Sequence, residues 1–167
     1  MSEVIINKVS DAIKVIEDTL KVAVKDLDQT DQVSVERLAT LDGYLLKHPR
    51  GTIGLLYNGS GYEKRDDSRG NVIFMKRNIL IGVVAIIRFF DNPQAGADRY
   101  KMMPSDYVDT ITDAIAGIEV QNNRPEYERK MFPVRDELVD EENGVWKYLT
   151  TFSVPIDYIE KNFRESF

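Results

Sequence analysis

Residues 143–156 read N-G-V-W-K-Y-L-T-T-F-S-V-P-I, an Asn-Gly pair followed at once by a strictly alternating segment. Asn-Gly tolerates the positive φ of a type I′ turn, so we expect residues 131–139 to fold back as the partner strand of a hairpin. Alternation places one set of side chains on each face of the second strand. One face carries Trp146, Tyr148, Thr150, Phe152, Val154 and Ile156, and the other carries Val145, Lys147, Leu149, Thr151 and Ser153. The sequence therefore predicts a large closing hairpin with an aromatic face that packs into the core.

Two amphipathic helices are predicted to pack on this sheet. In residues 3–27 the apolar positions recur every three or four residues, which is typical of one helical stripe. That stripe consists of Val9, Ile13, Ile16, Leu20, Ala23 and Leu27. A second stripe consists of Val108, Ile111, Ile115 and Ile118. Ser105 and Asp106 suit the N-terminus of the second helix, and Gly117 suits its end.

Residues 71–87 have the strongest strand composition, because six of the nine residues from 79 to 87 are Val or Ile. Both faces of this strand are apolar, and a helical layer covers only one face of a small sheet. We therefore expect another copy of the chain to cover the second face. Residues 33–38 and 52–57 are predicted as shorter strands, and the polar, glycine-containing residues 58–70 as an exposed loop or arm.

The expected fold is α+β, with a mostly antiparallel sheet packed against two amphipathic helices. A chain of 167 residues fits a single domain over residues 1–167, in which residues 157–167 form a C-terminal tail. The N-terminus lacks the pattern of a secretory signal, and the longest uncharged apolar run is far shorter than a membrane helix requires. We expect synthesis in the cytoplasm and no contact with a membrane.

Composition also limits the chemistry that the chain can perform. It has no cysteine, and its 28 acidic and 22 basic residues give a formal charge of −6. Specific binding of nucleic acid is therefore not expected, because a phosphate-neutralising surface is basic. His48 is the single histidine and has no neighbouring catalytic group in sequence, so we interpret it as a loop residue.

An acidic cluster precedes the Asn-Gly turn and leaves two interpretations open. It consists of Asp136, Glu137, Asp140, Glu141 and Glu142. Hard cations bind clustered carboxylates, so a metal-dependent hydrolase that uses Asp136, Asp140 and Glu142 is one hypothesis. The spacing does not match a calcium-binding EF-hand loop, and a solvated hairpin end is the interpretation we favour. No cofactor is predicted, and we expect a protein that is not an enzyme.

The order of these elements, with S-D-Y-V-D-T-I-T-D-A-I-A-G-I at residues 105–118 and V-W-K-Y-L-T-T-F at residues 145–152, resembles the tail terminator proteins of tailed bacteriophages. The type in Mu-like phages with contractile tails is the most similar, and the resemblance covers residues 4–156. It implies a structural virion protein that caps the tail tube as a hexameric ring and ends tube polymerisation. Tail-completion and head–tail joining proteins of the neck are the alternative within the same class.

The resemblance implies several partners: further copies of the chain, the tail tube protein, the sheath protein, and the connector proteins between head and tail. DNA would pass through the ring without specific binding, and the protein would be located in the tail or neck of the virion. Exposed aromatic and cationic residues are the types favoured at protein interfaces. On that ground we predict interface roles for Tyr62, Lys64, Arg65 and Arg69 in the arm and for Tyr158, Phe163 and Phe167 in the tail.

Overall fold

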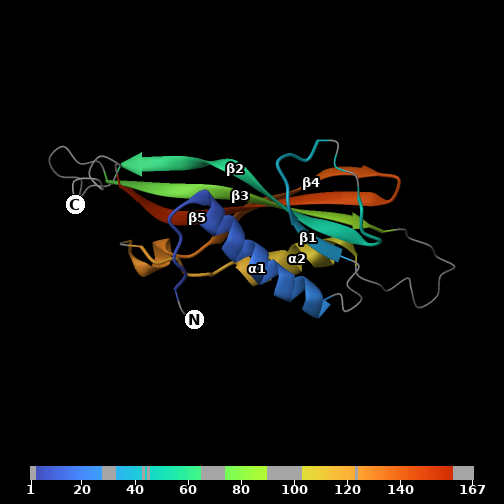
Figure 1. Cartoon of the computed structure of the whole chain (residues 1–167), viewed down its shortest axis with the longest axis horizontal. Coiled ribbons are helices and arrows are strands. Elements are labelled where there is room, and N and C mark those ends of the chain that lie inside the picture. The colour runs from blue at the N-terminus through green and yellow to red at the C-terminus, as the bar shows by residue number, and fades with distance from the viewer. Residues whose placement is uncertain are drawn as a thin grey trace.

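The computed structural model describes residues 3–27, 33–42, 44, 46–64, 74–89, 103–122 and 124–159. Its elements in chain order are α1 (Val9–Leu27), β1 (Val33–Arg37), β2 (Gly51–Lys64), β3 (Phe74–Arg88), α2 (Pro104–Ile115), a short 3-10 turn (Glu126–Glu128), β4 (Phe132–Glu142) and β5 (Val145–Ile159). The strands form one sheet in the order β1-β2-β3-β5-β4, in which only β1 and β2 pair in parallel. Both helices lie on the same side of this elongated sheet (Figure 1). The α+β prediction is confirmed.

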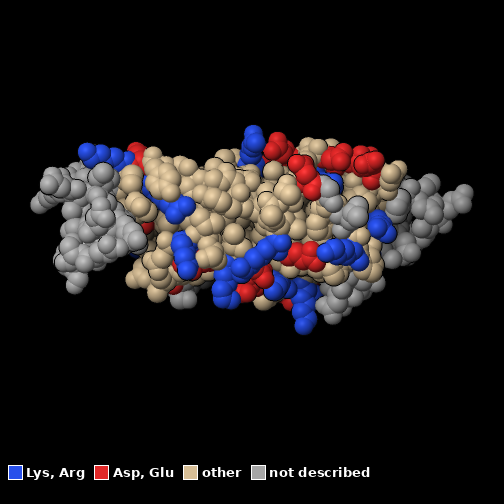
Figure 2. Space-filling model, turned by 45° about the horizontal axis from the view of Figure 1, so that its top comes forward, with Lys and Arg blue, Asp and Glu red and all other residues tan. Residues whose placement is uncertain are grey.

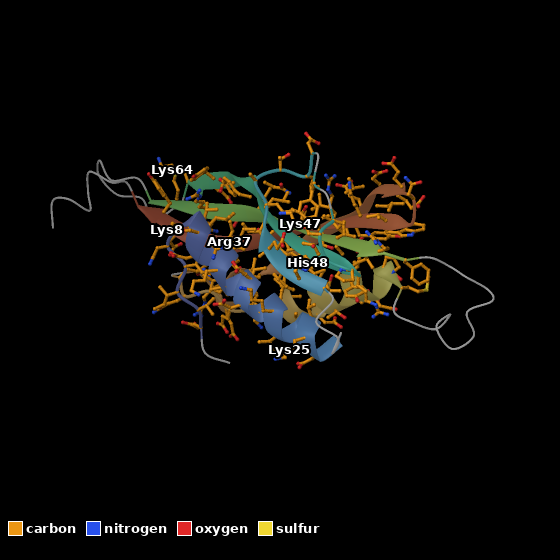
Figure 3. The ribbon with its side chains drawn as sticks, turned by 45° about the vertical axis from the view of Figure 1, so that its right-hand side comes forward. Lys8, Lys25, Arg37, Lys47, His48 and Lys64 are labelled. Atoms are coloured by element: carbon orange, nitrogen blue, oxygen red, sulfur yellow. The ribbon has the colours of Figure 1, made fainter. Side chains whose placement is uncertain are left out.

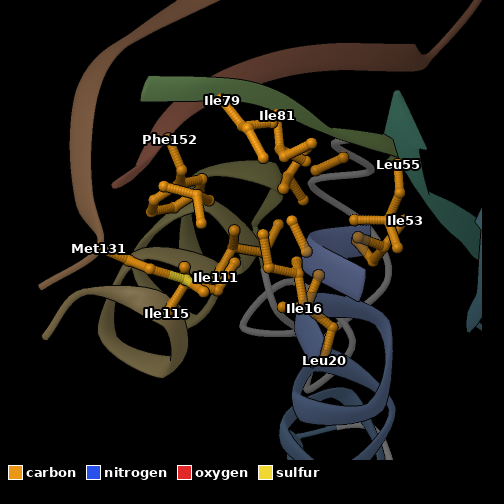
Figure 4. Packing of buried hydrophobic residues seen from close by; sticks show 14 of the residues in the cluster. Ile16, Leu20, Ile53, Leu55, Ile79, Ile81, Ile111, Ile115, Met131 and Phe152 are labelled. Carbon is orange, nitrogen blue, oxygen red and sulfur yellow. The ribbon is translucent and has the colours of Figure 1, made fainter. Parts of the chain in front are cut away.

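The main core lies between the helices and one face of the sheet. Alternate residues of β3 from Ile79 to Ile87 point toward the helices and are almost completely buried. Ile16 of α1 and Ile111 of α2 meet them from the opposite layer (Figure 4). Burying one such side chain contributes about 1.5–3 kcal/mol, so this layer provides much of the free energy that holds helices and sheet together. Phe152 of β5 is also fully buried there, as its place on the aromatic face predicted.

The second face of β3 is covered by the chain itself, which corrects the expectation that another copy covers it. Leu56, Val84 and Ile86 form a second buried cluster on this face. The residues packed against it include Leu38, Leu41, Tyr44 and Leu46, which follow β1. A Cβ at Gly54 would collide with the Leu38 side chain, so the glycine allows residue 38 to lie directly on the sheet. The apolar second face of the strand is therefore no argument for assembly.

The predicted hairpin is confirmed, and its turn has the expected geometry. Asn143 has φ 52° and Gly144 has φ 78°, as the two central residues of a type I′ turn require. The first strand is longer than the predicted residues 131–139, because β4 runs as far as Glu142. Two register shifts interrupt its pairing with β5, one between Pro133 and Arg135 and one between Leu138 and Asp140. Each shift is a β-bulge, so the side chains beyond it change face.

The exposed arm predicted over residues 58–70 is wrong for its described part. β2 continues through this segment to Lys64 and pairs with β3 on both sides of a bulge. A bulge between Tyr57 and Ser60 absorbs the glycines, and Gly59 adopts φ +99°. The bulge shifts the alternation by one residue, so the sequence of β2 shows no single alternating pattern from end to end.

Candidate assembly surfaces

One candidate surface is an aromatic cluster at the end of the sheet where β2 and β5 finish and β3 begins. The rings of Tyr62 and Tyr158 meet edge to face, with their centroids 6.0 Å apart. The guanidinium carbon of Arg77 lies 5.3 Å from the centroid of the Tyr62 ring, within the range of a cation–π contact. The cluster thus joins the three central strands at their common end.

Strand register explains why these residues meet. Tyr62 is paired with Arg77, and Tyr158 is paired with Met75 two positions away on β3. Cross-strand and diagonal neighbours on one face are within reach of aromatic side chains. Arg77 also donates from Nε to the Ser60 hydroxyl at 3.1 Å. Tyr62 remains half exposed, so the cluster presents an aromatic ring and a cation at the surface.

The hydroxyl of Tyr57 belongs to the same group of side chains. It lies 2.9 Å from the Ser60 hydroxyl and accepts a hydrogen bond of 3.4 Å from Arg77 Nη2. The hydrogen bond with Ser60, and then the contact with Arg77, lower the pKa of the Tyr57 phenol below its usual range. The arginine therefore connects both tyrosines of β2, one through its charge over the ring and one through the phenol oxygen.

Three of the seven predicted interface residues can be placed. Tyr62 and Tyr158 are in contact with each other, and Lys64 lies at the end of β2 opposite Met75 (Figure 3). They lie in paired strands and not in a free arm or tail. The remaining four, Arg65, Arg69, Phe163 and Phe167, lie outside the described residues.

A buried arginine stabilises this end of the sheet. Arg124 is only 7% exposed, and its Nη1 donates to Asn78 Oδ1 at 3.0 Å. Its Nη2 donates to the backbone carbonyl oxygens of Arg77 and Ile156, and its Nε lies 3.6 Å from Asp157 Oδ1. The guanidinium therefore ties the segment before β4 to β3 and β5. Sequence reasoning missed this residue, because all these partners lie more than 30 positions away in the chain.

The second candidate surface is β4, an edge strand of the sheet. All eleven of its residues are exposed. Four of them are large apolar residues that are about half exposed, namely Phe132, Val134, Leu138 and Val139. An edge strand with apolar side chains is a ready template for pairing with another chain. The same strand carries the acidic cluster, and acidic side chains gather over that end of the molecule (Figure 2).

The acidic residues of the metal hypothesis do not come together. Asp136 is paired with Thr150 and lines a recess against α2, together with Asp109. Beyond the bulge, Asp140 is paired with Lys147 and lies with Glu142 in a separate recess on the other face. No three His, Asp or Glu side chains in the described parts of the chain are grouped to hold a metal ion. The geometry gives no support to a cation site built from Asp136, Asp140 and Glu142.

His48 has a structural partner in β1. Its Nε2 lies 3.1 Å from Glu36 Oε1, and the Tyr44 hydroxyl donates to Glu36 Oε2 at 3.0 Å. Burial favours a higher pKa for the Glu36 carboxyl, but the two hydrogen bonds outweigh it, so the pKa lies below its usual range. The three side chains fasten the segment after β1 over the second face of the sheet.

The comparisons with known proteins give one family. The family described as "Gp37 protein" matches residues 28–166, which is most of the chain. No curated protein matches the chain. None of the helices in the described residues is both long enough and apolar enough to cross a membrane.

Proposed function

We propose that this chain, which belongs to the Gp37 family of bacteriophage proteins, is a structural protein of the virion that terminates the tail tube. In this proposal six copies form a ring on the end of the tube, stop its polymerisation and present a surface to the head connector. Family membership supports a phage structural role. The resemblance of the element order to tail terminators of the Mu-like type supports the more specific role.

The observation that carries the proposal is the exposed β4 edge. A protein that remains a monomer generally protects such an edge, because open backbone groups and apolar side chains attract other strands. β4 carries acidic residues, Pro133 and two bulges, which limit pairing, but it also exposes Leu138 and Val139 near its middle and Phe132 and Val134 near its start. Heterologous contacts of one edge with a different surface close into rings when the rotation is right. The edge is therefore suited to a ring subunit.

The remaining partners follow from the position of such a ring. One face would contact the tail tube protein and the sheath protein, and the other would contact the connector proteins between head and tail. A chain of net charge −6 does not attract phosphates, so DNA would pass through the lumen without specific binding. The proposal contains no catalytic step and no cofactor, and it places the protein in the tail or neck.

The ring is tested by measuring mass and shape together. Light scattering coupled to size exclusion should give about six times the mass of the 19.1 kDa chain, and negative-stain images should show a ring with a central hole. A tail-completion or head–tail joining protein of the neck would also be structural, but it would bind the connector and leave the growth of the tube unchanged. A chain that stays monomeric at millimolar concentration contradicts the ring in solution.

A further inference from the structure

The sheet has two open edges, which lie at opposite ends of the strand order. In the described part of the chain, β4 pairs only with β5, and β1 pairs only with β2. β1 runs parallel to β2, whereas each of the other neighbouring pairs is antiparallel. It follows that β1 and β4 point in opposite directions within one copy.

Charge argues against the pairing of two β4 strands with each other. β4 carries five acidic residues and a single cation, Arg135, which forms an ion pair of 3.2 Å with Glu137. Like charges placed directly opposite each other across two strands are destabilising. A symmetric β4–β4 contact would bring two such acidic rows together. The partner of β4 should therefore be an edge without a row of carboxylates.

β1 is such an edge, and it belongs to the same chain. Its five residues, V-S-V-E-R, contain one acid and one cation, and Val33 and Val35 are only partly buried. Arg37 at the end of β1 forms an ion pair with Glu17 of the neighbouring helix α1, and Lys21 pairs with the same carboxylate. The length also fits, because the two bulges of β4 leave Arg135 to Leu138 as its regular central segment.

We propose that β4 of one copy pairs with β1 of the next copy, so that the sheet continues from subunit to subunit. This inference rests on the proposed ring for the number of copies. If the ring axis runs along the strands, rotation from one copy to the next leaves the strand directions unchanged. β4 of one copy and β1 of the next copy therefore run antiparallel. The helices of all copies then lie on the same side of the continuous sheet.

Charge also selects the register. Asp136 and Leu138 point to the helical side of the sheet, as do Val33 and Val35 of β1. Placing Leu138 opposite Val33 forms an apolar pair and brings Arg135 opposite Glu36 on the other face. A shift of two residues, with Leu138 opposite Val35, would place two glutamates opposite each other. The first register is the one that the structure supports.

The absence of cysteine from the chain allows a direct test by disulfide trapping. V33C and L138C are purified separately, mixed at a concentration where the wild type associates, and oxidised. The proposed pairing yields a dimer of about twice 19.1 kDa on a non-reducing gel from the mixture, and from neither variant alone. V35C mixed with L138C tests the shifted register and should cross-link at least fivefold less. Y127C is the control outside the strands, because Tyr127 lies in the 3-10 turn and is 79% exposed.

A second measurement uses the unmodified protein. Amide hydrogen exchange in β4 should slow at least tenfold when the chain associates. Cross-linking of L138C with itself shows a symmetric β4 contact and overturns the proposal. A ring with neither the V33C–L138C cross-link nor protection of β4 overturns the edge pairing and leaves the proposed function standing. A chain that never associates contradicts both.

Discussion

Replacing Arg124 with methionine should destabilise the protein more than any comparable change at the surface. The side chain is 7% exposed, so methionine fills much of the space but removes every donor. Asn78 Oδ1 and the Ile156 carbonyl lose their hydrogen bonds from Arg124, and Asp157, whose side chain is 16% exposed, loses the nearby guanidinium charge. Removing one partner of a buried ion pair costs about 3–5 kcal/mol. We expect R124M to lose an amount of unfolding free energy in that range.

Urea unfolding followed by tryptophan fluorescence measures this loss, because Trp146 is the single tryptophan. R124M/D157N should be more stable than R124M, since the second substitution removes the negative charge that the Arg124 guanidinium no longer offsets. K76M serves as the matched control. It removes the ion pair of 3.1 Å between Lys76 and Glu128, whose side chains are about 30% exposed, and should cost less than about 1 kcal/mol. If R124M costs no more than K76M, the role assigned to Arg124 is refuted.

Three further predictions concern the second face and the edge. G54V should lower the unfolding free energy by about 1–3 kcal/mol in the same urea assay, because the new side chain collides with Leu38. An unchanged urea midpoint would show that Leu38 moves aside without cost and would contradict this prediction. L138K should reduce the mass measured by light scattering, while the free energy of unfolding stays within about 0.5 kcal/mol of the wild-type value because Leu138 is half exposed. An unchanged mass contradicts the role of Leu138 in assembly. The pKa of Glu36 is lowered, so its stabilisation is present above its usual 4.5 and is lost as pH falls through the folded pKa. Stability of E36Q should therefore fall less than that of the wild type on acidification, and parallel pH profiles would contradict this.

The hairpin and both helices were predictable because their signals are local. Asn143 and Gly144 define the turn, and the alternation that follows assigns the faces of β5. The far half of β2 was not predictable in the same way, because the bulge at Tyr57 breaks the alternation and the glycines resemble a turn. The second face of β3 is covered by the segment after β1, in which the apolar residues have no regular helical or strand spacing. Its placement is decided by contacts between residues distant in sequence, such as Leu38 with Gly54.

The candidate surfaces, too, were predictable from the sequence only in part. The sequence marks Tyr62 and Tyr158 as exposed aromatic residues, and in the structure their rings contact each other. Their roles as contacts between copies remain predictions. The β4 edge could not be found from the sequence, since the edge of a sheet is defined by strand order. The acidic cluster is one group in the sequence, but the bulge before Asp140 places Asp140 and Glu142 on the face opposite Asp136.

The growth of tail tubes in the presence of this protein tests the central claim most directly. Purified tail tube protein is allowed to polymerise with and without the wild-type chain, and tube lengths are measured by electron microscopy. Termination predicts that tubes stop growing once the chain is added, with a ring visible at one end and with L138K less effective than the wild type. Tubes that keep growing in an excess of the chain, with no ring at either end, would contradict the account.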